Sequence, residues 1–134
     1  LACELDEINS IGSVTGSMAG YYQCSPPKKS GIIHFHGMND AVVPYNGVEW
    51  SYSANAAHDF WKNHNQCNSQ NELTIPDFNG DGEYTKRLIS YDCEENKSVE
   101  LYSLEGEGHT WWKKSWGHDI NTSELIWQFF QSQQ

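Results

Sequence analysis

Short apolar runs, separated by polar, glycine-containing and proline-containing stretches, predict three strands along this chain. The first lies within residues 8–20, where a few apolar residues stand among Gly and Ser. The second is the short run that begins at Gly31 and stops at Gly37, and it is typical of a buried strand. The third, Ser98–Leu104, alternates apolar and polar residues, as strands with one buried face do. The second and third strands each lead into a loop that carries an ionisable side chain.

Apolar residues at helical spacing predict a helix from about Val48 to His64. The residues that form this stripe are Trp50, Ala54, Ala57 and Trp61. Such a stripe faces the core of a globular protein, so we expect its tryptophans to be buried. His58 and His64 fall outside the stripe and are expected to face solvent.

A second helix is predicted near the end of the chain. Asn121 is followed three residues later by Glu124, a spacing typical of a capping box at a helix start. The apolar face that follows consists of Leu125, Ile126, Phe129 and Phe130.

The order of these elements predicts a parallel sheet with helical crossovers. Residues 65–91 contain many Asn, Asp, Gly and Ser residues, so we expect an irregular excursion there with at most a short hairpin. Within it, Asp77–Gly82 matches the first half of a calcium-binding loop, but Leu88 stands where an EF-hand has its closing glutamate. A tight turn is therefore the expected structure of this stretch.

The chain is short and acidic. Its 134 residues suffice for one small domain, and a formal net charge of −10 argues against nucleic acid or an anionic membrane as a partner. No apolar run approaches the roughly 18 residues of a membrane-spanning helix. Residues 1–7 lack the basic start and apolar stretch of a signal peptide. They resemble the end of a helix whose first part is missing, so we expect the gene product to begin upstream of Leu1.

Four cysteines are present, and they allow three pairings. They are Cys3, Cys24, Cys67 and Cys93. None belongs to a CxxC pair, which argues against a structural zinc site. We expect Cys3–Cys24 and Cys67–Cys93, because each bridge would then bracket a continuous segment. Disulfides persist in oxidising compartments, so the predicted location is secreted, extracellular or periplasmic.

Two motifs carry the candidate chemistry. One runs from His36 to Tyr45 and reads HGxxDxxVPY, with Asp40 as its acid. The other runs from Gly106 to Trp111 and reads GxGHTW, with His109 at its centre. These motifs resemble the acid loop and the histidine loop of secreted α/β-hydrolase esterases of the polyhydroxybutyrate depolymerase and feruloyl esterase type.

The resemblance implies a fold and an activity. The fold is the C-terminal portion of an α/β hydrolase, with about three parallel strands and crossover helices, stapled by disulfides, and residues 1–134 form one partial domain. The activity is hydrolysis of carboxylic esters, with polyester or feruloyl and acetyl esters as substrates and without a metal or cofactor. Asp40 corresponds to the triad acid and His109 to the general base, while Trp111 and His36 are predicted to contact substrate. The chain departs from the family at Trp112, where a proline is usual.

The nucleophile of such an esterase is absent from the sequence. It belongs in a G-x-S-x-G turn, but the two glycine pairs with that spacing in residues 12–20 enclose Val14 and Met18. The chain is therefore expected to be inactive alone. Its expected partner is a missing N-terminal half that carries the serine, or a second copy of the chain that covers the edge of the first strand.

Two other functions remain open from the sequence. His34 and His36 share one face of a strand, so with Asp40 they could bind the metal ion of a metal-dependent hydrolase. Alternatively, the six Trp and seven Tyr residues could form the face of a non-catalytic carbohydrate-binding or polyester-binding module. Most of these aromatic residues fall at spacings typical of a core, which weighs against a binding face.

Overall fold

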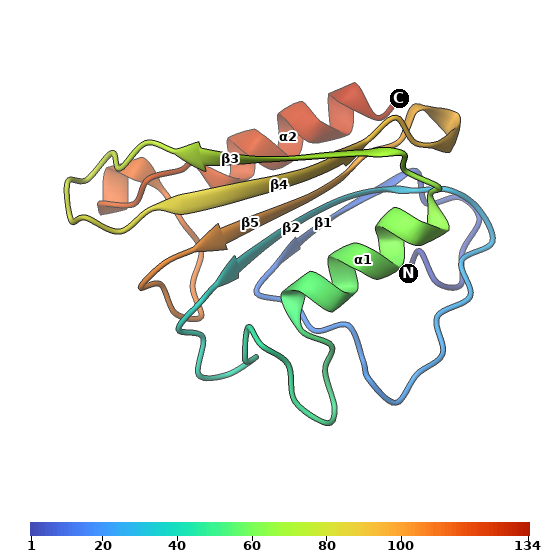
Figure 1. The fold of residues 1–134 in the computed structure, drawn as a ribbon, viewed down its shortest axis with the longest axis horizontal. Coiled ribbons are helices and arrows are strands. Elements are labelled where there is room, and N and C mark those ends of the chain that lie inside the picture. The colour runs from blue at the N-terminus through green and yellow to red at the C-terminus, as the bar shows by residue number, and fades with distance from the viewer.

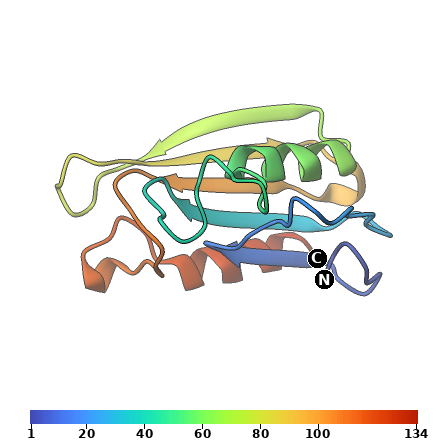
Figure 2. The ribbon, with the colours of Figure 1, turned by 90° about the horizontal axis from the view of Figure 1, so that it is seen from below.

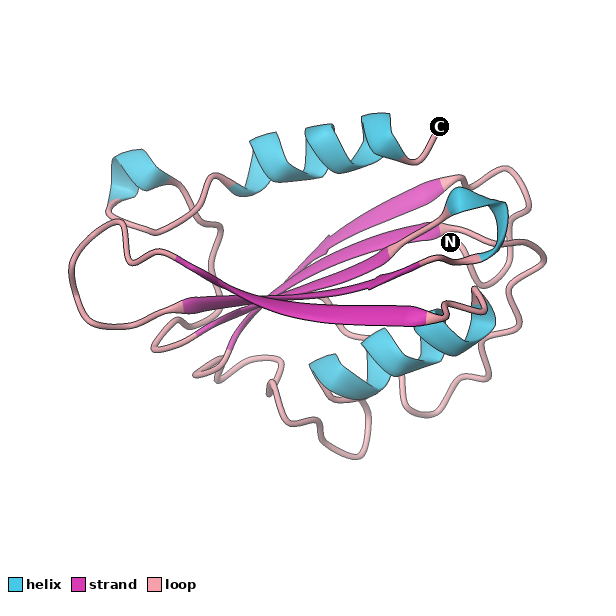
Figure 3. Cartoon of the chain, turned by 45° about the horizontal axis from the view of Figure 1, so that its top comes forward, coloured by secondary structure: helices cyan, strands magenta, loops and turns pink.

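The computed structural model describes residues 1–134 and contains one five-stranded sheet with a helix on each face (Figures 1 and 3). The strands are β1 (Ser10–Val14), β2 (Gly31–Gly37), β3 (Ser69–Ile75), β4 (Thr85–Tyr91) and β5 (Val99–Leu104). The α-helices are α1 (Ala54–His64) and α2 (Thr122–Ser132), and short 3₁₀ turns lie at Glu94–Asn96 and Lys114–Trp116. The order across the sheet is β1-β2-β5-β4-β3, which places β1 and β3 at the edges (Figure 2).

The sheet is mixed, which overturns the fold predicted from the sequence. β1, β2 and β5 are parallel to one another, but β4 is antiparallel to both β5 and β3. Only two α-helices are present, and the connection between β1 and β2 contains none. The expected portion of an α/β-hydrolase fold, with three parallel strands and crossover helices, is therefore wrong for this chain.

The error arose in residues 65–91, which form a long hairpin rather than an irregular excursion. β3 and β4 pair along seven residues, from Ser69 opposite Tyr91 to Ile75 opposite Thr85. β3 lies at the sheet edge and is mostly exposed, so it needs few apolar residues. Its sequence consequently lacks the alternation by which a strand is recognised.

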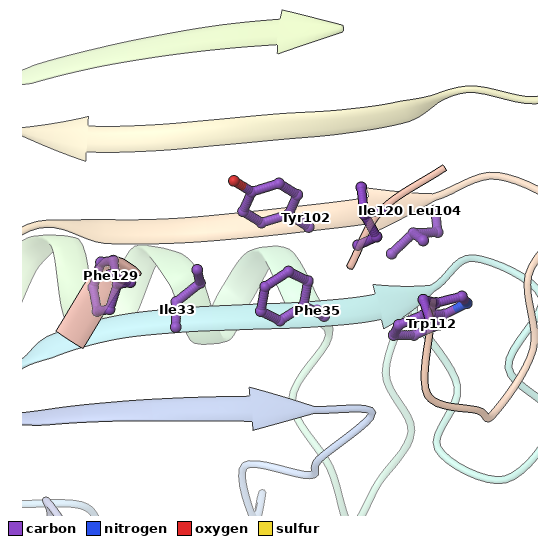
Figure 4. Close-up of a cluster of buried hydrophobic side chains, with 7 residues drawn as sticks. All are labelled: Ile33, Phe35, Tyr102, Leu104, Trp112, Ile120 and Phe129. Atoms are coloured by element: carbon purple, nitrogen blue, oxygen red, sulfur yellow. The ribbon is translucent and has the colours of Figure 1, made fainter. Parts of the chain in front are cut away.

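The two helices cover different faces of β2, which is buried along its whole length. Because successive side chains of a strand point to opposite faces, Ile33 and Phe35 lie on the α2 side, whereas Ile32 lies on the α1 side. Figure 4 shows the larger core cluster on the α2 side. It comprises Ile33, Phe35, Tyr102, Leu104, Trp112, Ile120 and Phe129. On the α1 side, Ala2, Ile32, Trp61 and Val99 form a smaller cluster.

The first helix is shorter than predicted, which changes the environment of several side chains. It begins at Ala54, after Ser53 accepts a hydrogen bond from the backbone N–H of Ala56. Trp50 therefore lies outside the helix and is 45% exposed. His58 is buried rather than solvent-facing, and His64 is half-buried and contacts the carbonyl oxygen of Lys28 at 2.9 Å.

The C-terminal helix is confirmed, but its predicted capping box is not formed. Asn121 precedes α2 without a side-chain capping bond. Its Oδ1 instead accepts a hydrogen bond from the backbone N–H of Lys114 at 2.9 Å. The apolar face of the helix packs as predicted, with Phe129 buried in the core and the other apolar residues against it.

Both predicted disulfides, Cys3–Cys24 and Cys67–Cys93, are present, and no cysteine is free. The second bridge closes the open end of the β3–β4 hairpin, next to a backbone hydrogen bond from Asn68 to Asp92. None of the helices has the length and apolar character that crossing a membrane requires.

Replacing both Cys67 and Cys93 by serine should lower the free energy of unfolding by about 3 kcal/mol, because the bridge closes a loop in the unfolded chain. The two cysteines are 26 residues apart. Urea unfolding of the oxidised wild type and the double variant measures the difference. A matched variant without Cys3 and Cys24, which are 21 residues apart, should lose a similar amount. A loss below about 1 kcal/mol in both variants would contradict this account of the bridges.

Candidate active site

The loops that follow β2 and β5 meet at the C-terminal ends of these two strands. The strands are parallel neighbours that end together at Gly37 and Leu104. Gly37 allows the close approach: an added Cβ would overlap the carbonyl oxygens of Glu107 and Gly108. Across this contact, the backbone N–H of Asn39 donates to the Glu107 carbonyl at 2.9 Å. The first loop carries Asp40 and the second carries His109.

The contact expected between Asp40 and His109 is present. His109 Nδ1 lies 2.9 Å from Asp40 Oδ2. The carboxylate side chain is completely buried, whereas the imidazole is 38% exposed. The pair therefore combines a fixed, enclosed carboxylate with an imidazole that solvent can reach.

Hydrogen bonds hold the Asp40 carboxylate in its ionised form. Oδ1 accepts the backbone N–H groups of Val42 and Val43, each at 2.8 Å. Burial works to raise the pKa of the carboxyl group, but the Val43 N–H, the His109 ring and the Val42 N–H together outweigh burial and lower it. An ionised Asp40 can only accept, so His109 carries its proton on Nδ1 and leaves Nε2 free to accept a proton.

Thr15 occupies the space in front of this free nitrogen, and sequence reasoning missed it. Its Oγ1 lies 3.5 Å from His109 Nε2, and it follows β1 directly. The backbone at Thr15 is left-handed, with φ of 53°, a conformation unfavourable for a β-branched residue. Its hydroxyl donates to the Val14 carbonyl at 2.7 Å, so the hydroxyl proton is not shared with His109. No pattern in the sequence predicts this backbone conformation.

The serines near β1 do not serve as the nucleophile in this arrangement. Ser17 donates to Ser51 Oγ at 2.8 Å. Ser13 lines a cavity of about 250 Å³ on the α1 side of the sheet, which neither Asp40 nor His109 reaches. The site thus contains an acid and a base but no serine hydroxyl bonded to the base.

The two residues predicted to contact substrate occupy different environments. His36 is 2% exposed, and its Nε2 contacts the Val43 carbonyl oxygen at 2.7 Å. It lies beneath Asp40, where too little of its surface is exposed to contact a substrate. Trp111 is 40% exposed, and its Nε1 donates to Ser123 at 3.2 Å, so substrate contact stays a prediction for Trp111 alone. Trp112, at the position where the family has proline, is completely buried in the core and anchors the histidine loop.

The structure gives no support to a metal site. No group of three or more His, Cys, Asp or Glu side chains is arranged to hold a metal ion. His34 and His36 contact each other at 3.0 Å, and Asp40 is bonded to His109. In the calcium-loop stretch, the Asp77 carboxylate accepts the backbone N–H groups of Gly80 and Gly82, which makes the expected turn.

The expectation that most aromatic residues lie in the core is wrong for the tryptophans. Trp61 and Trp112 are buried, whereas the other four are at least 40% exposed. The exposed tryptophans are Trp50, Trp111, Trp116 and Trp127. They belong to four separate segments: the loop before α1, the histidine loop, the second 3₁₀ turn and α2.

In comparisons with known proteins, no protein-family model matches this chain, and no curated protein shows significant similarity to it.

Proposed function

We propose that this chain supplies the acid and the general base of a Ser-His-Asp carboxylic ester hydrolase. The observation that carries the proposal is the 2.9 Å contact between His109 Nδ1 and the buried Asp40 carboxylate. This contact fixes the imidazole tautomer and leaves Nε2 able to take a proton from a serine hydroxyl. Both roles follow the motifs that resemble those of secreted esterases.

The reaction proceeds in two acyl-transfer steps. His109 Nε2 takes the serine proton while the serine oxygen attacks the ester carbonyl, and Asp40 stabilises the imidazolium that forms. The imidazolium then gives its proton to the leaving alcohol, and an acyl-enzyme remains. In the second step His109 takes a proton from water, which attacks the acyl group. The released serine recovers its proton from His109.

The substrate class follows from the resemblance and from charge. Polyesters, feruloyl esters and acetyl esters are the candidates that the motifs imply. A net charge of −10 disfavours strongly anionic substrates, since like charges repel. The exposed face of Trp111, two residues after His109, is suited to contact an apolar or aromatic part of the ester.

The serine comes from a polypeptide segment that lies against β1. This strand is an edge of the sheet with one unpaired side, and an open edge favours pairing with another strand. A largely apolar cavity lined by Ile11, Met18 and Trp61 adjoins the same edge. The segment carries G-x-S-x-G and belongs to an N-terminal half. A second copy of the chain is the alternative cover for this edge, but it lacks the motif and would leave the serine to be supplied by another segment. Two disulfides fit a secreted, extracellular or periplasmic enzyme.

A fluorophosphonate probe, which reacts with activated serines, tests the proposal by intact mass. This chain should stay unlabelled, and the segment or partner that carries the serine should gain one adduct. His109→Gln should abolish the adduct. The control His118→Gln, in the same region but paired with Glu107 at 2.9 Å, should not. Labelling that survives His109→Gln, or an adduct on a residue within 1–134, would overturn the proposal.

A further inference from the structure

Two buried histidines form a hydrogen-bonded row beneath the candidate acid. His36 Nε2 contacts the Val43 carbonyl oxygen at 2.7 Å and lies 3.5 Å from Asp40 Oδ2. His36 Nδ1 lies 3.0 Å from His34 Nε2. The row therefore extends from the acid loop to His34, in the middle of β2.

The row has only one proton arrangement in which both rings are neutral. The Val43 carbonyl can only accept, so His36 Nε2 carries a proton and donates it. In this arrangement His36 has a bare Nδ1, which accepts from a protonated His34 Nε2. A single backbone carbonyl thus sets the tautomers of both rings. The opposite tautomer would place the bare Nε2 of His36 against the Val43 oxygen and against the Asp40 carboxylate.

His34 stays neutral, which keeps this arrangement in place. Burial lowers the pKa of His34 to about 3, and the neighbouring His36 and His58 rings add to the effect. The ring therefore donates from Nε2 without becoming a cation beside His36. His58 is also buried, but its Nε2 contacts Ser90 Oγ at 2.8 Å, so it stands outside the row.

We propose that His36 is a positioning residue for Asp40. His34 fixes His36 in the tautomer whose Nε2–H donates to the Val43 carbonyl. By holding the Val43 carbonyl, His36 keeps the same residue's N–H on Asp40 Oδ1. Its Nε2 also lies 3.5 Å from Oδ2, the oxygen that contacts His109 Nδ1. The consequence for catalysis rests on the proposed ester hydrolase, whereas the geometry of the row does not.

Ring nitrogen NMR of the 134-residue chain tests the proton arrangement without any assay of activity. At neutral pH both His34 and His36 should show a protonated Nε2 and a bare Nδ1. Detection of a protonated Nδ1 on His36 would overturn the inference. Because this readout uses the wild type, it does not depend on whether a variant folds.

Carbon NMR of the Asp40 carboxyl group tests the positioning role. His36→Phe fills the space but removes both ring nitrogens, so the pKa of Asp40 should rise by about one unit, because hydrogen bonds to a carboxylate lower its pKa. His36→Gln, whose amide can still donate to Val43, should restore most of the wild-type value. The matched control His58→Phe also replaces a buried histidine and should leave Asp40 unchanged.

An unchanged pKa of Asp40 in His36→Phe, or an equal rise in His58→Phe, would overturn the positioning role. If His36→Phe does not fold, His36→Gln and His36→Asn decide the question, because asparagine is too short to reach Val43 and should raise the pKa. Failure of the esterase proposal would appear differently. In that case the NMR results would stand, while no serine would take the fluorophosphonate label.

Discussion

Replacing Asp40 by asparagine should lower kcat for ester hydrolysis by about 10⁴-fold, the loss seen when the acid of a Ser-His-Asp protease is changed in the same way. The measurement applies to any preparation in which the wild-type chain is active together with its serine. Because the acid acts on the transition state, kcat and kcat/KM should fall together.

The structure gives a specific reason for so large an effect. Oδ1 of Asp40 accepts the N–H groups of Val42 and Val43, so an asparagine must keep its carbonyl oxygen there. Its NH₂ group then takes the place of Oδ2 and donates to His109 Nδ1. The ring must carry its proton on Nε2 instead, and a protonated Nε2 cannot accept the proton of the serine. The substitution thus inverts the tautomer while leaving the loop in place.

A matched substitution separates this effect from a general loss of charge. Asp59 is exposed on α1, and Asp59→Asn should retain wild-type activity. Thermal unfolding of both variants checks that each is folded. A loss below about tenfold for Asp40→Asn, or about 1.4 kcal/mol in the activation free energy, would contradict the assignment of Asp40 as the triad acid.

The meeting of Asp40 and His109 could be predicted because motif and topology agree. Each residue follows a strand that the sequence marks clearly, and parallel neighbouring strands end at the same edge of a sheet. Thr15 could not be predicted, because its position in front of His109 depends on a left-handed backbone that residue types do not specify. His36 was assigned to the substrate because a motif gives the residue but not the depth at which its ring lies.

The fold was predicted less well than the contact between Asp40 and His109, for a related reason. Hydrophobic periodicity detects elements that bury a face, and it found β2, β5 and α2. β3 lies at an edge and buries little, so its sequence carries no such signal. In α1 the stripe was taken to start at Trp50. The true buried face is Ala54, Ala57, His58 and Trp61, and it includes a histidine that a search for apolar residues does not count.

The two buried histidines His58 and His34 should make the stability of the chain sensitive to mild acid. Burial is the main cause that lowers the pKa of His58 to about 4, with Asp59 opposing and Lys62 adding to it. Burial, with His36 and His58 next to it, lowers the pKa of His34 to about 3. In the unfolded chain both rings take up protons near the ordinary pKa of 6.5.

The sign of the effect follows from proton linkage. Below the ordinary histidine pKa of 6.5, the unfolded state binds protons at His34 and His58 that the folded state does not bind. The free energy of unfolding is therefore highest above pH 6.5 and falls as the pH decreases. From pH 7 to pH 5 each histidine should remove about 2 kcal/mol, or about 4 kcal/mol together. Asp40, whose pKa is lowered from 3.8, loses its contribution only at lower pH.

Urea unfolding at pH 7, 6 and 5 measures this loss. His58→Gln cannot take up a proton and should reduce the loss between pH 7 and 5 by about half. His64→Gln, on the same helix but half-buried, controls for the replacement of any histidine of α1 and should keep most of the wild-type loss. Since small domains have only about 5–15 kcal/mol of stability, a loss of this size would remove between about a quarter and four fifths of it at pH 5. A free energy of unfolding that is equal at pH 7 and pH 5 would show that His34 and His58 take up protons in the folded state.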